Sequence, residues 1–322
     1  MSGQTVVVTD HDFDDLGIER AVLDGVAEVV ALADDVGDVP TDAPAELVDA
    51  DAVLNLRYDI DADAIAEMDD CRVIARYGIG VDNVAIEAAA DRGIPVTNVP
   101  DYCHEEVATH ALSLTLSLAR GLKRYDASVA AGEWDRGVSA PLHRFSTRTV
   151  GVVGYGAIGR EVGARAAALG ADVLASDPFL DAEDLADDPA TLTSFEDLCA
   201  RADVVTVHSP LTDDTRRLLD ADAFARMDDT AVVINVARGP IVDVDDLHDA
   251  IEAGELGGAG LDVFPNEPPA ADHPLRDHPR VVTTPHVAWY SEEAGDDRRR
   301  RAAGIVRDVL TGGDPEHVVN GV

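Results

Sequence analysis

The sequence places an arginine, a glutamate and a histidine in three separate segments, each after an apolar run of the kind that forms a buried strand. These residues are Arg238, Glu267 and His286. Histidine takes up or releases a proton near neutral pH, a nearby carboxylate orients the imidazole and favours its protonated form, and a guanidinium holds a carboxylate through two hydrogen bonds. The set predicts acid/base chemistry on the hydroxyl of a small carboxylic acid, as needed when a hydride moves between the hydroxyl carbon and a nicotinamide.

Each of these residues also has an ordinary structural interpretation. Arg238 suits a helix cap or a surface ion pair, Glu267 is one acid among many, and His286 suits a loop that satisfies its hydrogen bonds. Their joint position favours the catalytic interpretation, because ligands bind at the carboxyl ends of strands in an open α/β sheet. Three widely spaced cysteines indicate neither a disulfide framework nor a metal site.

A glycine-rich turn between an apolar run and a helical segment predicts a dinucleotide site. The turn consists of Gly154, Tyr155, Gly156, Ala157, Ile158 and Gly159. Its glycines allow a tight turn, a close approach of pyrophosphate and close packing of helix on strand, and the helix N-terminus attracts phosphate. Asp177 ends the next strand-like run, where its carboxylate accepts the ribose hydroxyls and repels a 2′-phosphate. We therefore expect NAD rather than NADP; the alternative is a tight turn that binds nothing.

Short β-branched runs alternate with segments of helical period. The first strands are predicted at Thr5–Thr9, Glu28–Leu32, Ala52–Leu56, Arg72–Arg76 and Pro95–Asn98, with helical segments such as Asp63–Met68 and Asn83–Asp91 between them. Later strands are predicted at Thr149–Val153, Asp172–Ser176, Val204–Val207, Ala231–Asn235, Gly258–Asp262 and Val281–Thr284. This alternation predicts an α/β protein with two doubly wound parallel sheets, Rossmann-like or flavodoxin-like, covered by helices on both faces.

Long helices are expected to join the two units. Glu105–Tyr125 is predicted to be one amphipathic helix, followed by a loop over Ala131–Arg144, and a closing helix runs from Ser291 to about Leu310. The segment from Asp177 to Pro189 is expected to be a polar connector. The four residues Arg298–Arg301 point around the closing helix, which favours a solvated, salt-bridged face over a phosphate site.

The charge balance restricts the partners of the protein. Subtracting 63 acidic from 25 basic side chains gives a net charge of −38, which repels nucleic acid and anionic membrane surfaces. Such self-repulsion needs screening, and molar salt shortens the Debye length to about 3 Å, so a halophilic source is favoured over codon bias alone. No apolar run is long enough to span a membrane, and the first residues read as a strand rather than a secretion signal. We expect a cytoplasmic protein.

The sequence resembles the D-isomer-specific 2-hydroxyacid dehydrogenase family over essentially its whole length. The segments that carry the resemblance are VGYGAIGREVGARAAALG, NVARGPIVDVDDL, GAGLDVFPNEPP and TPHVAWYSEEA. The resemblance implies that Arg238 binds substrate and that Glu267 pairs with His286, the acid/base. It also implies an NAD-binding domain at residues 104–289, inserted into a substrate domain formed by residues 1–103 plus 290–322, and a homodimer formed largely through the inserted domain.

The segment around the histidine looks like the C-terminal-binding-protein branch of this family. The resemblance implies that Trp289 lines the substrate pocket, although packing between domains is an equally open role. It implies further substrate contacts from the loop residues Arg76, Tyr77, Gly78 and Ile79, whose glycine exposes backbone N–H groups. Further NAD contacts are implied at Thr109, His208, Ser209, Pro210, Val236, Asp262 and His286. The branch has a serine near Ile79, so a polar contact is lost there.

Three functions compete. The leading hypothesis is an NAD-dependent dehydrogenase that interconverts a small 2-oxo acid and its 2-hydroxy acid. Phosphoglycerate dehydrogenase or glyoxylate/hydroxypyruvate reductase is the alternative within the enzyme class. An NAD(H)-sensing, corepressor-like binding protein is the alternative from another class, and the absence of extra tails or basic segments favours the enzyme. The stereochemistry is implied by the resemblance alone, and the residues do not define the substrate side chain.

Overall fold

A computed structural model describes residues 3–32, 45–139 and 141–322 of the chain. The chain divides into two compact units. Unit 1 combines Met1–Tyr102 with Ser291–Val322, and unit 2 is the intervening segment Cys103–Tyr290. Each boundary lies one residue from the position expected from the sequence. Residue 140, in the expected loop 131–144, lies outside the described residues.

Unit 1 is built on a five-stranded parallel sheet with the order β2-β1-β3-β4-β5. Its strands are β1 (Thr5–Val8), β2 (Glu28–Ala31), β3 (Ala52–Asn55), β4 (Ile74–Arg76) and β5 (Val96–Thr97). Its helices are α1 (Gly17–Val22), α2 (Ala45–Val48), α3 (Ala62–Glu67), α4 (Ile86–Asp91) and α11 (Glu292–Leu310). Successive side chains of a strand point to opposite faces: Val6 and Val8 join the core beneath α11, and Val7 joins the core beneath α3.

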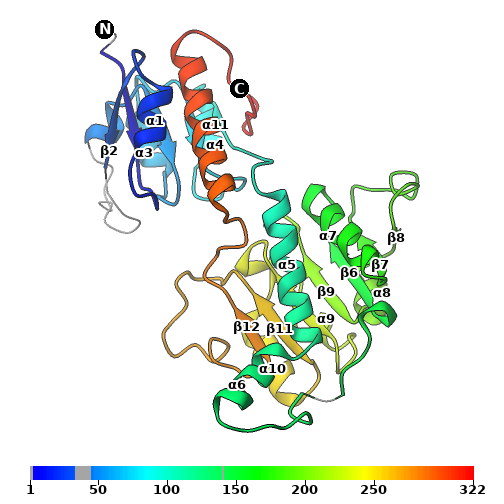
Figure 1. Ribbon diagram of the computed structural model, residues 1–322. Helices are drawn as coiled ribbons and strands as arrows, with labels where there is room; N and C mark the ends of the chain where they lie inside the picture. Colours follow the sequence, from blue (N-terminus) through cyan, green and yellow to red (C-terminus); the bar gives the residue numbers. More distant parts are fainter. Residues whose placement is uncertain (1–2, 33–44, 140) are drawn as a thin grey trace. The chain divides into compact units, whose positions relative to one another are not determined.

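The last helix, α11, belongs to unit 1 and packs against α1, β3 and β4 (Figure 1). Ser291 caps its N-terminus by accepting a hydrogen bond from the Ala294 amide. The expectation of a wholly solvated arginine face is wrong for half of the run. Arg300 and Arg301 lie in exposed ion pairs, but Arg298 and Arg299 are buried.

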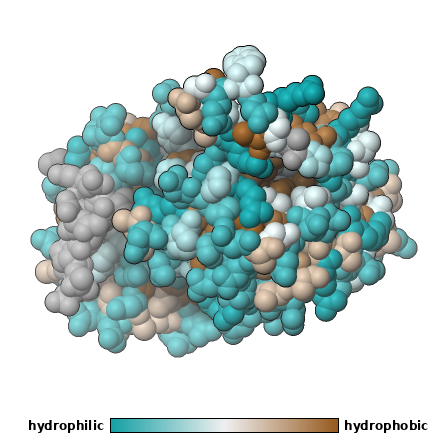
Figure 2. Space-filling view, turned by 90° about the horizontal axis from the view of Figure 1, so that it is seen from below, coloured by the Kyte–Doolittle hydropathy of each residue, from teal (hydrophilic) through white to brown (hydrophobic). Residues whose placement is uncertain are grey.

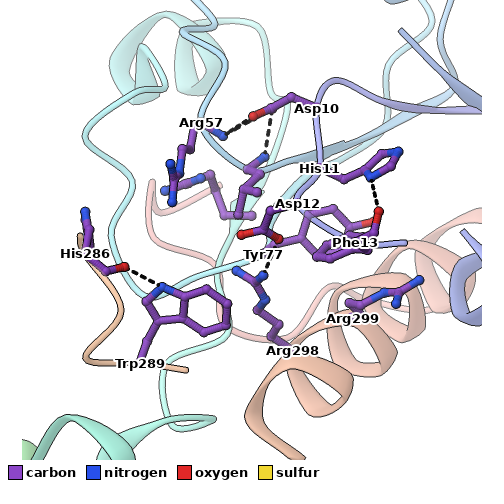
Figure 3. A network of polar contacts seen from close by, with 12 residues as sticks. Asp10, His11, Asp12, Phe13, Arg57, Tyr77, His286, Trp289, Arg298 and Arg299 are labelled. Carbon is purple, nitrogen blue, oxygen red and sulfur yellow. Dashed lines mark hydrogen bonds and ion pairs between the residues drawn. The ribbon is translucent and has the colours of Figure 1, made fainter. Parts of the chain in front are cut away.

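The buried arginines are held by acidic partners in the same unit. The Arg299 guanidinium donates to both carboxylate oxygens of Glu19, at 2.8 and 2.7 Å, and lies 4.2 Å from the ring centre of Phe13. Arg298 pairs with Asp12 at 2.6 Å. Because a buried guanidinium is tolerated only with such partners, the network ties the start of α11 to the loop after β1 (Figure 3).

Unit 2 contains a seven-stranded parallel sheet with the order β12-β11-β10-β9-β6-β7-β8. Its strands are β6 (Thr149–Val153), β7 (Asp172–Ser176), β8 (Ala190–Leu192), β9 (Val204–Val207), β10 (Val232–Asn235), β11 (Gly258–Leu261) and β12 (Val281–Thr283). The prediction of two parallel α/β sheets is confirmed. The edge strand β8 lies just after the expected polar connector, and its short run ATL gave no clear strand signal.

Helices cover both faces of this sheet. They are α5 (His104–Ala119), α6 (Leu122–Ala130), α7 (Ala157–Ala168), α8 (Phe195–Arg201), α9 (Ala221–Phe224) and α10 (Val244–Ala253), with short 3₁₀ turns at Phe145–Thr147 and Gly239–Ile241. α5 packs along β10, β11 and β12 and against α7 (Figure 1). The large apolar core lies on the α8, α9 and α10 side.

The single long helix predicted over 105–125 is in fact two helices. The chain breaks at Gly121, whose φ of +61° lies in the left-handed region. A Cβ at Gly121 would lie 2.0 Å from the Ser139 hydroxyl oxygen, so only glycine fits beside this loop. Amphipathic periodicity continues across the break, and for this reason the sequence pattern does not reveal it.

Hydrophilic side chains cover most of the face shown in Figure 2, as the composition requires. Within the described residues, no helix combines the length and the apolar character needed to cross a bilayer.

Candidate active site

The residues predicted to do chemistry gather at the carboxyl edge of the unit 2 sheet. All strands of this sheet run parallel, so their carboxyl ends share one edge. The glycine turn follows β6, Asp177 follows β7, and His208–Pro210 follow β9. Arg238, Glu267 and His286 follow β10, β11 and β12. Parallel pairing therefore brings together residues that are more than a hundred positions apart.

His286 and Glu267 form a direct pair. The imidazole Nδ1 lies 2.6 Å from Glu267 Oε2, and about a third of each side chain is exposed (37% and 34%). The second carboxylate oxygen, Oε1, accepts a hydrogen bond of 2.9 Å from the Phe264 amide. Glu267 is thereby fixed at both oxygens, and it fixes the ring of His286. Among the described residues, Nε2 of His286 makes no hydrogen bond, so this nitrogen can exchange a proton with a bound molecule.

A glycine brings Arg238 close to the segment that carries Glu267. A Cβ on Gly239 would lie 2.0 Å from the carbonyl carbon of Phe264, so only glycine allows these two backbones to pack so closely. Asn235 stabilises the same turn: its amide donates to the Arg238 carbonyl at 2.9 Å, and its Oδ1 accepts from the Ala237 amide at 3.1 Å. The Arg238 guanidinium donates to the Ala237 carbonyl at 2.8 Å and is half-buried.

Asp262 holds the loop that carries His286 through several hydrogen bonds. This carboxylate is 1% exposed and accepts hydrogen bonds of 2.9 Å from the amides of Val287 and Ala288. The Asp262 carbonyl accepts the His286 amide at 2.8 Å. His286 has a φ of +55°, which is uncommon for a residue other than glycine. We attribute the stability of this backbone conformation to these hydrogen bonds, which hold the loop at several points.

Trp289 closes the same loop. Its indole N–H donates to the His286 carbonyl at 3.0 Å, as Figure 3 shows. Its ring is half-buried and meets the Tyr290 ring edge to face at 5.4 Å. The Trp289 side chain therefore stabilises the loop that carries His286, in addition to any contact with a bound molecule.

The glycine turn has the geometry that a dinucleotide requires. Gly154 has a φ of +83°, and a Cβ there would lie 2.6 Å from the Ser209 nitrogen. A Cβ on Gly159 would lie 2.3 Å from the Gly154 carbonyl, whereas one on Gly156 would meet nothing within 4 Å. The turn is thus tight at two glycines and open at the third, where a pyrophosphate would approach. The amides of Gly156 and Ala157 donate to no described residue, as expected for a helix N-terminus that holds an anion.

Asp177 lies beside this turn. Its Oδ2 accepts the Tyr155 amide at 2.9 Å and its Oδ1 accepts the Phe179 amide at 3.0 Å. The half-buried carboxylate is therefore held in place at the end of β7. Tyr155, by contrast, points its ring into the core and is 0% exposed, so only its backbone can contribute to a cofactor site.

The other expected cofactor residues differ in their surroundings. His208 is half-buried, its Nε2 lies 2.9 Å from Thr206 Oγ1, and desolvation lowers its pKa to about 3, so it is neutral at physiological pH. Ser209 touches the glycine turn, and Val236 is buried after β10. Pro210 is exposed after β9, and Thr109 is exposed on α5.

Unit 1 carries the loop Arg76–Ile79 at the carboxyl end of β4. The amides of Gly78 and Ile79 donate to no residue in the described part of the chain. Arg76 Nε donates to the Gly80 carbonyl at 2.9 Å. The Tyr77 side chain cannot contact a substrate, because it is fully buried and its hydroxyl donates to Glu19 at 3.2 Å.

Sequence reasoning missed Arg57, which lies at the same edge of unit 1, after β3. The buried Asp10 carboxylate accepts the Arg57 amide at 2.9 Å and the Tyr58 amide at 3.1 Å, and so fixes this loop (Figure 3). The exposed guanidinium of Arg57 makes no hydrogen bond or ion pair to any described residue. Other described arginines, such as Arg20 and Arg144, also lack a side-chain partner, and a single residue after a strand forms no motif, so the sequence pattern does not single out Arg57. Within the same ranges, no group of side chains is suited to hold a metal ion.

Comparison with known proteins agrees with this geometry. Residues 112–288 match the family model described as "D-isomer specific 2-hydroxyacid dehydrogenase, NAD binding domain". D-3-phosphoglycerate dehydrogenase of Mycobacterium leprae is 40% identical over 88% of this chain, but the match covers 55% of that protein. The chain thus spans about half the length of that curated relative.

Two further matches extend over most of both chains. Glycerate dehydrogenase of Methylorubrum extorquens is 34% identical over 86% of this chain and 88% of its own. The crystal structure of D-lactate dehydrogenase from Aquifex aeolicus, complexed with NAD and lactic acid, has a TM-score of 0.87 and 28% identity and covers 95% of this chain and 96% of its own. The chain therefore belongs to the D-isomer-specific 2-hydroxyacid dehydrogenase family.

Proposed function

We propose that the protein is an NAD-dependent dehydrogenase that interconverts a 2-oxo acid and the corresponding 2-hydroxy acid. The observation that carries the proposal is the pair of His286 Nδ1 and Glu267 Oε2 at 2.6 Å, at the same sheet edge as the glycine turn. A carboxylate at Nδ1 sets the tautomer and stabilises the imidazolium. Nε2 then gives a proton to the substrate carbonyl oxygen during reduction and recovers it during oxidation.

The residues of the glycine turn fit NAD. Gly156 leaves open space, and the first amides of α7 lack partners among the described residues. Asp177 is fixed at the end of β7, beside the glycine turn, where it can bind the hydroxyls of a ribose. The bound cofactor supplies or accepts the hydride. The Asp177 carboxylate binds ribose hydroxyls and disfavours a 2′-phosphate, which supports NAD over NADP. Ser209, Pro210, Val236, Asp262, His208 and Thr109 are further proposed contacts.

Arg238 is the proposed anchor of the substrate carboxylate. A guanidinium can hold that group through two hydrogen bonds and polarise the adjacent carbonyl. In unit 1, the amides of Gly78 and Ile79 have no partner among the described residues and are suited to a carboxylate oxygen. We propose that this loop and Arg76 contribute to substrate recognition through the backbone. Trp289 is the proposed contact for the substrate side chain, as in the C-terminal-binding-protein branch that the sequence HVAWYS resembles.

Arg57 favours a second candidate within the same chemistry. Its guanidinium is exposed and unpaired among the described residues, and its backbone is fixed by Asp10. Such a cation suits a substrate with a second anionic group, such as a phosphate. This candidate corresponds to a phosphoglycerate dehydrogenase. Arg57→Leu then raises the KM for a phosphorylated substrate at least about tenfold and leaves that for glyoxylate unchanged.

We also propose that the protein works as a homodimer in a salt-rich cytoplasm. Three apolar side chains of the α6 region are exposed in unit 2, namely Leu122 (56%), Val129 (53%) and Trp134 (92%), and a second copy would cover them. All three cysteines are free and buried, as suits a reducing compartment. The net charge of −38 suits molar salt.

Oxidation of NADH with a panel of 2-oxo acids tests the proposal. The assay is run in about 2 M KCl with glyoxylate, hydroxypyruvate, pyruvate, branched and aromatic oxo acids, and the oxidised form of phosphoglycerate. We expect turnover with at least one of them, and His286→Gln abolishes it while NADH still binds. Tight NADH binding without turnover of any member would instead favour the corepressor-like alternative.

A further inference from the structure

A hydrogen-bonded chain links helix α5 to the loop that carries the catalytic histidine. His110 Nε2 lies 2.9 Å from the Thr284 hydroxyl oxygen, and that hydroxyl donates to Asp262 Oδ1 at 2.6 Å. The same Oδ1 accepts the Val287 amide. The chain therefore ends on the carboxylate that holds the backbone on the C-terminal side of His286.

Packing of α5 on the sheet places His110 within reach. Leu114, one turn after His110 on the same helix, approaches β11 where the strand has a glycine. A Cβ on Gly260 would lie 3.0 Å from the Leu114 Cβ, so the absence of a side chain at Gly260 sets the distance between helix and strand. Residues four apart share one face of a helix, and His110 therefore faces the carboxyl ends of β11 and β12.

The direction of the hydrogen bonds follows from the number of protons. A threonine hydroxyl has one proton, and Thr284 donates its proton to the Asp262 carboxylate. The bond between His110 and Thr284 then requires a proton on Nε2, with the hydroxyl oxygen as acceptor. His110 acts as an N–H donor that orients the hydroxyl of Thr284 toward the carboxylate.

We propose that His110 is a positioning residue for the reaction: through Thr284 and Asp262 it fixes the loop that aims His286. The proposal rests on the proposed dehydrogenase function. His110 belongs to no catalytic motif of the sequence, and its side chain is 23% exposed, so it is a partly accessible group rather than a core residue. A carboxylate with a fully oriented set of donors holds Val287 and Ala288 more firmly than one whose third donor has turned away.

The test uses donor-deficient and donor-retaining variants. His110→Leu removes the N–H, His110→Gln supplies one from an amide, and Thr284→Val removes the link itself. Ser113→Ala on the same helix is the control, since its hydroxyl donates only to the Thr109 carbonyl. We expect kcat to fall about tenfold for His110→Leu and Thr284→Val, with KM for the oxo acid and Kd for NADH within about twofold of the parent. His110→Gln retains most of the activity.

The double variant His110→Leu/Thr284→Val distinguishes a chain from two separate effects. Because both substitutions break one chain, we expect kcat to fall no further than in Thr284→Val alone. If kcat of the double variant fell by the product of the two single losses, the proposal would be overturned. Equal losses of kcat in His110→Gln and His110→Leu would also overturn it.

Hydrogen exchange provides a readout that does not need turnover. In His110→Leu, we expect the amides of Val287 and Ala288 to exchange at least several-fold faster, while those of β11 stay unchanged. Faster exchange in a protein that turns over no oxo acid refutes the dehydrogenase assignment but keeps the positioning chain. Unchanged exchange refutes the positioning chain.

Discussion

Replacing Glu267 with glutamine changes one charge and preserves the size of the side chain. In the protein, Oε1 accepts the Phe264 amide and Oε2 faces His286 Nδ1 at 2.6 Å. A glutamine that keeps the bond to Phe264 through its oxygen presents its NH₂ group to Nδ1. Nδ1 must then be an acceptor, whereas the protonated ring has a donor at both nitrogens. The substitution therefore disfavours the acid form that reduction requires.

The magnitude follows from the type of bond that is lost. A hydrogen bond to a charged group contributes about 1.5–3 kcal/mol. The pair is about one-third exposed on each side, which places it in the lower part of that range because solvent screens it. Each 1.36 kcal/mol corresponds to a tenfold change in a rate constant, so we expect kcat/KM for the oxo acid to fall about 10- to 40-fold.

Steady-state oxidation of NADH measures this effect, and NADH binding by fluorescence shows whether the cofactor site is intact. Glu252→Gln is a matched control, since Glu252 pairs with His278 at 2.8 Å elsewhere in unit 2. The control leaves kcat/KM unchanged. If Glu267→Gln stayed within about twofold of the parent, the carboxylate would have no part in catalysis and the reasoning would be refuted.

Three further predictions concern cofactor choice, packing and pH. Asp177→Ala raises kcat/KM for NADPH relative to NADH by about tenfold or more, because the charge that repels a 2′-phosphate is gone; an unchanged ratio in steady-state assays would contradict the role of Asp177. Gly239→Ala destabilises the protein by about 2–4 kcal/mol in urea unfolding, because its Cβ would overlap the Phe264 backbone. Burial lowers the pKa of His208 from 6.5 to about 3. As the pH falls from 6.5 toward 3, His208 is therefore protonated in the unfolded chain but not in the folded protein, and the free energy of unfolding decreases. At about pH 5 this costs about 2 kcal/mol, and His208→Gln flattens the dependence of the unfolding free energy on pH; an equal slope in the variant would rule His208 out.

The fold was largely predictable because its strands are buried on both faces. Runs such as Val150–Val153 and Val204–Val207 are continuous and apolar, which is typical of parallel sheets. Short elements with weak patterns were not predicted. β8 has only three residues, and the four-residue helix α9 depends on the Asp220 cap. The break between α5 and α6 lies at Gly121, a glycine in the left-handed region, but the apolar periodicity continues across it, so periodicity alone predicted one helix.

The position of the candidate site was predictable where one motif specifies its own geometry. The positions of single side chains that meet from different elements were less predictable. The glycine turn specifies strand, turn and helix together, so its position follows from the sequence. A carboxylate beside His286 was expected from the chemistry of the residues, but the geometry of its pairing with Glu267 was implied by family resemblance, because the two residues lie 19 positions apart. Tyr77 was expected to contact substrate, but alternation along the strand turns its side chain into the core. Arg57 and His110 have no local signal, since their roles depend on neighbours from other elements.

Transfer of a labelled hydride is the most direct test of the central claim. The protein is incubated with a 2-oxo acid that it reduces and with NADH deuterated at the transferred position, and the product is analysed by mass spectrometry. We predict that deuterium appears on the carbon that bears the new hydroxyl, and that His286→Gln binds NADH but forms no labelled product. A product without deuterium on that carbon, or a His286→Gln variant as active as the parent, would contradict the account.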